Sequence, residues 1–178
     1  MQRRWFLTVV VVSIVLVVFC KTRWQQLRPY DWQLSESSEG HFRLRFPAMP
    51  MPSEGEVSGM DGRHFSSNKL AASPRNGVVY ALDWWENPGQ RDESTDALFG
   101  YFRECDVRAL PGGSVTQKNL TIGGYPATEI EVTAKNGSVM TNRVIRVGGR
   151  FYSLFVIDTT GHVDRKNINK FFDSWAHI

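Results

Sequence analysis

The feature that most constrains this chain is a series of glycine turns that join neighbouring strand-like segments in its second half. Asn136-Gly137 is typical of a two-residue hairpin turn, and Gly148-Gly149 predicts another tight return. Short turns of this kind connect antiparallel strands, whereas parallel strands need crossovers of about a dozen residues or more. The turns therefore exclude an all-parallel doubly wound sheet and predict an antiparallel meander.

Alternating and continuous apolar segments predict the strands themselves. Phe42, Leu44 and Phe46 alternate with polar residues, which is typical of a strand with one buried face. Residues 78–85 and 151–157 are apolar on both faces, so we expect both to be central strands that are covered on each side. The predicted strands are residues 41–46, 63–71, 78–85, 114–121, 127–134, 139–147 and 151–157.

Two amphipathic segments predict helices. Ser94 and Asp96 are typical of a helix start, and Pro111-Gly112-Gly113 ends that helix. Its expected core face consists of Leu98, Phe99, Phe102, Cys105 and Ala109. The expected core face of the C-terminal helix consists of Ile168, Phe171, Phe172 and Trp175. The predicted fold class is α+β, an antiparallel β-sheet with helices packed on it.

The N-terminal segment has a different character. Residues 5–20 carry no charge and are flanked by basic residues, so residues 1–21 are predicted to be a transmembrane signal anchor. Residues 22–40 lack apolar periodicity and are predicted to be a tether, followed by the folded domain at 41–178. We expect a single-pass membrane protein with its domain on the extracytoplasmic side.

Two other interpretations of this segment stay open. A cleaved signal peptide would also have a basic start and an apolar middle, but no A-x-A-like site follows the apolar run. Lipidation of Cys20 is the second alternative, although bulky Phe19 stands where such sites prefer a small residue. The uncleaved anchor is the interpretation that fits both observations.

The distribution of charge argues against nucleic-acid binding. The net charge is +3, but five of the 21 basic residues precede Asp31, which leaves 16 against all 18 acidic residues. A domain that binds phosphates normally presents a clustered basic surface. The folded part is instead slightly acidic, so no nucleic-acid partner is expected.

Several strings resemble the PsbP-like superfamily over about residues 40–178. They are HFRLRFPAMP, VVYALDWW, LTIGGYPATEIEV, RVIRVGGRFYSLFVI and INKFFDSW. The resemblance implies an α/β/α sandwich. It also implies a binding or accessory role, because members are described in photosystem assembly, small-GTPase binding and effector chaperoning. The chain departs from the photosynthetic members in having a predicted membrane segment in place of a plastid transit peptide.

The search for catalytic and metal-binding patterns finds none. The sequence contains no G-x-S-x-G, phosphate-binding loop, G-x-G-x-x-G, H-E-x-x-H or C-x-x-C motif. Cys105 is expected to be a small core residue, and Cys20 lies in the predicted anchor. The four histidines lack the spacing of a helix-borne metal site. We therefore expect no metal and no cofactor.

The candidate binding residues are Asp83, Trp85 and Glu86. Adjacent strand residues point to opposite faces, so Trp84 and Trp85 are both buried only where both faces are covered. An exposed Trp85 with acidic neighbours would resemble an aromatic anchor at a protein interface. The alternative is that Trp85 belongs to the core.

Two functions follow from these observations. The first is a membrane-tethered, non-catalytic binding or accessory module that engages a protein partner. The second is an anchored hydrolase whose Ser, His and Asp come together only in three dimensions. A contact between Ser114 or Ser153 and a histidine in a cleft would favour the second.

Overall fold

The computed structural model describes residues 29–60, 62–86 and 94–178. The chain divides into two units, Met1–Tyr30 and Asp31–Ile178, and every described helix and strand belongs to the second. The predicted anchor at residues 1–21 lies outside the described residues. Within the described ranges, no helix combines the length and apolar character needed to cross a membrane.

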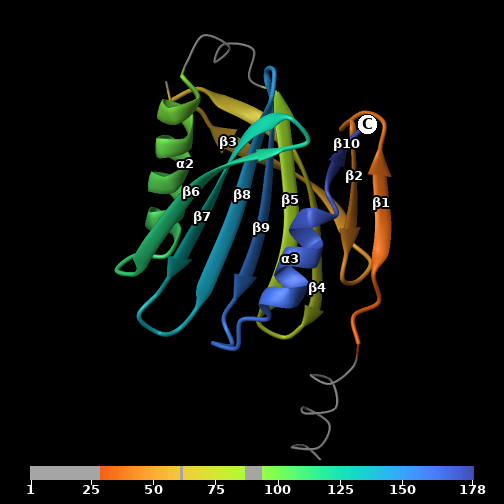
Figure 1. Cartoon of the computed structure of the whole chain (residues 1–178), viewed down its shortest axis with the longest axis vertical. Helices are drawn as coiled ribbons and strands as arrows, with labels where there is room; N and C mark the ends of the chain where they lie inside the picture. Colours follow the sequence, from red (N-terminus) through yellow and green to blue (C-terminus); the bar gives the residue numbers. More distant parts are fainter. Residues whose placement is uncertain (1–28, 61, 87–93) are drawn as a thin grey trace, which may run out of the picture. The chain divides into compact units, whose positions relative to one another are not determined.

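Seven strands form one antiparallel sheet, in the order β3-β4-β5-β9-β8-β7-β6 (Figure 1). The strands are β3 (Met51–Ser58), β4 (His64–Arg75), β5 (Val78–Glu86), β6 (Ser114–Ile122), β7 (Tyr125–Thr133), β8 (Val139–Val147) and β9 (Arg150–Asp158). The sequence predicts all of them except β3. Its prolines indicate a strand end, but Pro52 lies in an edge strand, where a residue without an N–H is tolerated.

The turn between β7 and β8 is longer than predicted. The Ala134 N–H donates to the Ser138 carbonyl at 2.8 Å, so residues 135–137 form a three-residue loop. Gly137 has φ 84°, the left-handed conformation that such loops require at their last position. The return at Gly148-Gly149 has two residues, as predicted, because Val147 pairs with Arg150.

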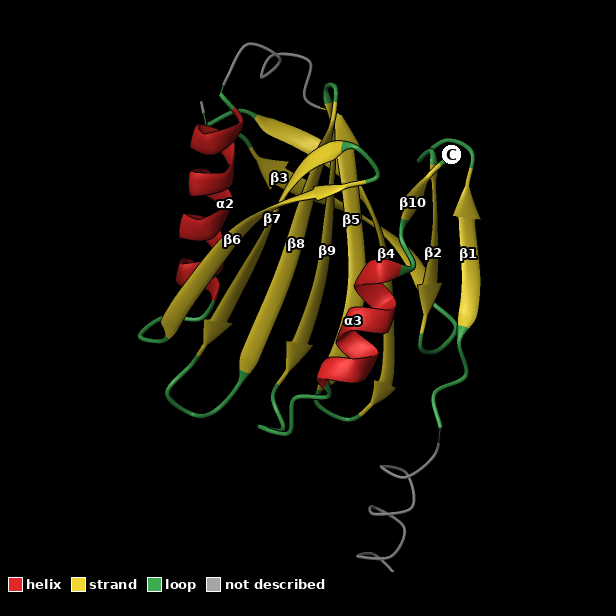
Figure 2. Cartoon of the chain, in the orientation of Figure 1, coloured by secondary structure: helices red, strands yellow, loops and turns green. Residues whose placement is uncertain are grey.

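Both faces of the sheet are covered (Figures 1 and 2). Helix α2 (Thr95–Ala109) packs on one face, over β7 and β8. The other face carries α3 (Arg165–Asp173) and a small sheet in the order β1-β2-β10. Its strands are β1 (Gln33–Ser37), β2 (Phe42–Phe46) and β10 (Ala176–His177). The arrangement confirms the α+β class with antiparallel pairing and helices on the sheet.

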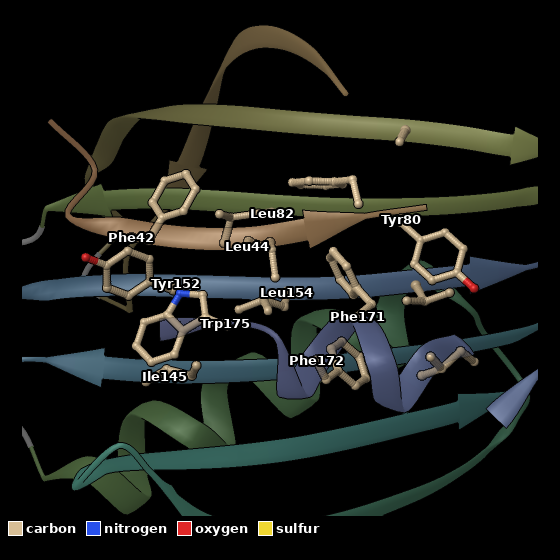
Figure 3. Close-up of a cluster of buried hydrophobic side chains, with 14 of the residues drawn as sticks. Phe42, Leu44, Tyr80, Leu82, Ile145, Tyr152, Leu154, Phe171, Phe172 and Trp175 are labelled. Atoms are coloured by element: carbon tan, nitrogen blue, oxygen red, sulfur yellow. The ribbon is translucent and has the colours of Figure 1, made fainter. Parts of the chain in front are cut away.

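The larger core lies between the seven-stranded sheet and α3 (Figure 3). Phe171 of α3 contacts Tyr80 of β5 and Phe46 of β2, with both ring-centre distances at 5.3 Å. The predicted apolar face of the last helix is buried, although the helix ends at Asp173 and Trp175 packs from the segment that follows. This core joins the small sheet to the large one.

The folded part begins earlier than the sequence indicates. The sequence predicts a tether over residues 22–40, but β1 pairs along its whole length with β2, from Gln33–Phe46 to Ser37–Phe42. Trp32 packs against the larger core. The signal is weak in the sequence because an edge strand of half-buried and exposed residues shows little apolar periodicity.

Candidate functional site

Helix α2 forms one wall of the candidate site. Ser94 caps its start, with the side-chain oxygen accepting from the Ala97 N–H at 3.2 Å, as the sequence predicts. The expected core face is partly wrong: Leu98 and Phe99 are buried, whereas Ala109 is exposed and Cys105 is half-buried. The buried position near the end of the helix belongs to a carboxylate, Asp106.

Trp85 lies in the core and does not form an exposed anchor. Its side chain is 6% exposed and stacks on Phe151, the residue opposite it on β9, at a ring-centre distance of 5.6 Å. Phe102 of α2 contacts the same indole at 5.8 Å. The prediction of an exposed Trp85 is wrong, because Phe102 of α2 covers the indole. The alternative, that Trp85 belongs to the core, is confirmed. Of the two adjacent tryptophans, the half-buried one is Trp84, on the opposite face.

A cleft of about 530 Å³ opens between α2 and the sheet. Trp85, Phe102 and Phe155 supply aromatic lining, and β3 contributes Val57 and Ser58 from the other side. The Tyr101 hydroxyl donates to the Ser58 carbonyl at 2.9 Å and so links α2 to β3 beside the opening. Volumes of roughly 300 to 1,000 Å³ with mostly apolar lining are typical of ligand sites.

Polar side chains cross the floor of the cleft. The Ser153 hydroxyl donates to Asn142 Oδ1 at 2.8 Å, and Asn142 Nδ2 donates to both carboxylate oxygens of Asp106 at 3.2 and 3.0 Å. Burial raises the pKa of Asp106 to about 6, and the hydrogen bond from Asn142 partly offsets this effect. This chain of hydrogen bonds fixes α2 to β8 and β9.

Asp83 continues the polar band on β5, directly opposite Ser153. Asp83 Oδ2 lies 3.3 Å from Lys69 Nζ on the neighbouring strand. Its other oxygen, Oδ1, is buried and has no hydrogen-bond partner among the described residues. Burial raises the pKa of Asp83, opposed by the charge and hydrogen bond of Lys69. An acceptor left without a donor is uncommon in folded proteins.

The structure separates the three predicted binding residues. Asp83 and Trp85 share one face of β5, and both line the cleft. Glu86 does not line it; it is exposed at the end of the strand and forms an ion pair with Arg150. The sequence therefore locates two residues of the cleft, but it wrongly predicts that the side chain of Trp85 is exposed.

Sequence reasoning missed Asp106, Asn142 and Ser153. Two of them carried a signal. Asp106 follows Phe102 by four residues on the apolar face of the helix, and Ser153 interrupts the apolar stretch 151–157 of β9. Asn142 lies between the polar residues Thr141 and Arg143 of β8, so the local pattern does not single it out. Polar residues at core positions are typical of hydrogen-bonded networks or sites.

One serine of the cleft lining lies near a histidine: Ser58 Oγ is 3.5 Å from His64 Nδ1, and the same nitrogen lies 2.5 Å from Glu56 Oε1, on exposed side chains. A catalytic triad instead places the serine and the carboxylate on opposite nitrogens of the ring. Ser153 donates to an amide oxygen, and none of the described histidines belongs to its hydrogen-bonded chain with Asn142 and Asp106. Nor does the part of the chain that the structure describes contain a group of three or more histidine, cysteine or acidic residues that could hold a metal ion.

Comparison with known proteins places the fold. No family model matches the chain, and no curated protein matches it. The solution structure of cyanobacterial PsbP from Synechocystis sp. PCC 6803 is similar with a TM-score of 0.58 at 10% sequence identity, over 85% of this chain and 95% of that one.

Two further structures show weaker similarity. A Pseudomonas aeruginosa protein of unknown function, PA94, gives a TM-score of 0.44 at 11% identity over 77% of this chain and 89% of its own. A Bacteroides thetaiotaomicron protein gives 0.41 at 10% identity over 82% of this chain and 48% of its own. Together with the element order and the layers described above, the cyanobacterial match shows that this chain has a PsbP-like fold.

Proposed function

We propose that this chain is a membrane-tethered binding or accessory module without catalytic activity, and that it engages a protein partner through the cleft between α2 and the sheet. The observation that carries the proposal is the cleft itself, which joins aromatic lining to an unpaired carboxylate oxygen. Clefts with mainly apolar and aromatic lining and a few polar groups are typical binding sites.

The tether belongs to the same proposal. Residues 5–20 are uncharged and flanked by basic residues, so they are suited to hold the domain at a membrane with the domain on the extracytoplasmic side. The domain carries a slight negative charge and no clustered basic run, which supports a protein partner over nucleic acid.

The chemistry of Ser153 supports a binding role over hydrolysis. A serine nucleophile needs a neighbouring base that takes its proton. Ser153 instead donates to the side-chain oxygen of Asn142, and an amide oxygen is not a base at neutral pH. Hydrolysis of a generic ester by the full chain, abolished by Ser153→Ala, would contradict the non-catalytic proposal.

Filling the cleft should remove partner binding without unfolding the chain. Cys105 lines the cleft and is half-buried, so Cys105→Phe places a ring in the open space. We expect the tagged full chain to capture at least about tenfold less partner from its own membranes, the effect of losing an interface anchor. Quantitative mass spectrometry of the captured protein measures the loss.

The matched control is Arg103→Phe, which adds the same ring to an exposed position of α2. Its capture should equal that of the parent chain. If Cys105→Phe lowers the melting temperature, Cys105→Met provides a smaller filling group. Equal capture by the cleft and control variants would contradict the proposed site.

A further inference from the structure

Three hydrogen-bond donors that line the cleft are already used, whereas a carboxylate acceptor remains. The Ser153 hydroxyl donates to Asn142, and the Asn142 amide donates to Asp106. The Tyr101 hydroxyl donates to the Ser58 carbonyl. Asp83 Oδ1 accepts no hydrogen bond from the described residues. A ligand with hydrogen-bond donors can therefore bind to the Asp83 carboxylate. An anionic ligand would be repelled by the carboxylates of Asp83 and Asp106.

The positive charges near the cleft do not cancel this preference. Lys69 pairs with Oδ2 of Asp83 and leaves Oδ1 without a partner. Arg108 lies at the cleft with an exposed side chain, and both its ion pair and its Nε hydrogen bond go to Glu104 on the same helix. Two carboxylates, Asp83 and Asp106, therefore face the space that a ligand would fill.

The aromatic lining suits a cation on an apolar stem. Lys69 Nζ lies 5.9 Å from the ring centre of Phe155, so a cation already sits against this part of the cleft. Trp85 and Phe102 add two more rings, and Met140 adds apolar surface. Arginine and lysine carry a charged head on an aliphatic stem, which fits a cleft that is apolar and ends at a carboxylate.

We infer that the cleft binds an arginine or lysine side chain of the partner protein, with its cationic head against the carboxylate of Asp83 and its stem along Phe155 and Trp85. The inference rests on the proposed function, since it names the group that enters the same cleft. The proposed occupant of the cleft is a basic side chain of a protein.

The test is a titration of the full chain in lipid nanodiscs with the peptide Ac-Gly-Arg-Gly-NH2, followed by the NMR signal of the Trp85 indole N–H. The matched probe carries citrulline, which has nearly the shape of arginine without its charge. We expect the arginine peptide to bind at least about fivefold tighter, because charge-assisted hydrogen bonds are stronger than neutral ones. The lysine peptide should bind more tightly than its norleucine counterpart.

Two variants assign the preference to Asp83. Asp83→Asn should abolish the difference between arginine and citrulline, whereas Asp96→Asn, on the exposed first turn of α2, should keep it. Lys69→Gln should strengthen arginine binding, since it removes the cation that competes for Asp83. A merely structural Asp83–Lys69 pair would not produce that gain. Melting temperatures establish that each variant is folded.

Three results would overturn the inference. They are equal binding of the arginine and citrulline peptides, an arginine preference that survives Asp83→Asn, and absence of a response at Trp85. Each is distinguishable from failure of the proposed function, because loss of partner capture in Cys105→Phe is measured without these peptides. A cleft that binds its partner through neutral groups would lose capture on filling and show no preference for arginine.

Discussion

We expect Trp85→Ala to lower the free energy of unfolding by about 3 to 5 kcal/mol, the usual cost of truncating a buried aromatic residue. The indole stacks on Phe151 and contacts Phe102, so its removal takes away contacts between α2 and the central strands. Urea unfolding of the full chain, followed by circular dichroism, measures the loss.

Glu86→Gln is the matched control for this experiment. Glu86 is the next residue on β5, but its side chain is 67% exposed and pairs with Arg150 near the surface. Exposed ion pairs typically contribute about 0 to 1 kcal/mol, so this variant should unfold almost as the parent does. A loss below about 1 kcal/mol for Trp85→Ala would contradict its place in the core.

The second large effect is a pH dependence of stability that depends on Asp106. Burial raises its pKa from 3.8 to about 6 in the folded chain, so the folded state holds the proton more tightly than the unfolded state does. The contribution of Asp106 to stability is therefore largest below about pH 4, falls as pH rises toward about 6, and then levels off. The difference in pKa corresponds to about 3 kcal/mol.

Asp106→Asn isolates this effect from the other carboxylates. Glu129 contributes with the opposite sign, because burial, which would raise its pKa, is outweighed by Lys118 and Arg143. We expect the variant to gain about 2 to 3 kcal/mol relative to the parent between pH 4 and pH 7.5. Denaturant titrations across that range measure the gain. A constant difference between the two chains would show that Asp106 ionises normally in the fold.

The strands and their direction could be predicted from the sequence because local patterns determine them. Turn glycines and alternating apolar residues depend on near neighbours, so Val139–Val147 has the predicted bounds. Local patterns do not predict the edge strands β1 and β3. In β1 and β3 most side chains are exposed or half-buried, and their place depends on pairing with distant residues.

The cleft could be predicted only in part because it depends on how α2 lies across the sheet. Strand alternation correctly places Asp83 and Trp85 on one face. Whether that face is open or covered depends on contacts between residues far apart in sequence, such as Trp85 with Phe102. The link from Asp106 to Asn142 joins residues 36 positions apart, and no local pattern encodes it.

The most direct test of the central claim is the reactivity of Cys105 toward N-ethylmaleimide, in a full chain that also carries Cys20→Ser. Cys105 lines the cleft, so a bound partner should cover its thiol. We predict labelling at least about tenfold slower in the native membrane than in the purified chain, as for a site occupied about nine-tenths of the time. In a control chain with Arg103→Cys and Cys105→Ser, the cysteine at this exposed position should react equally in the membrane and in the purified chain. Equal labelling rates for Cys105 in the membrane and in the purified chain would contradict occupation of the cleft.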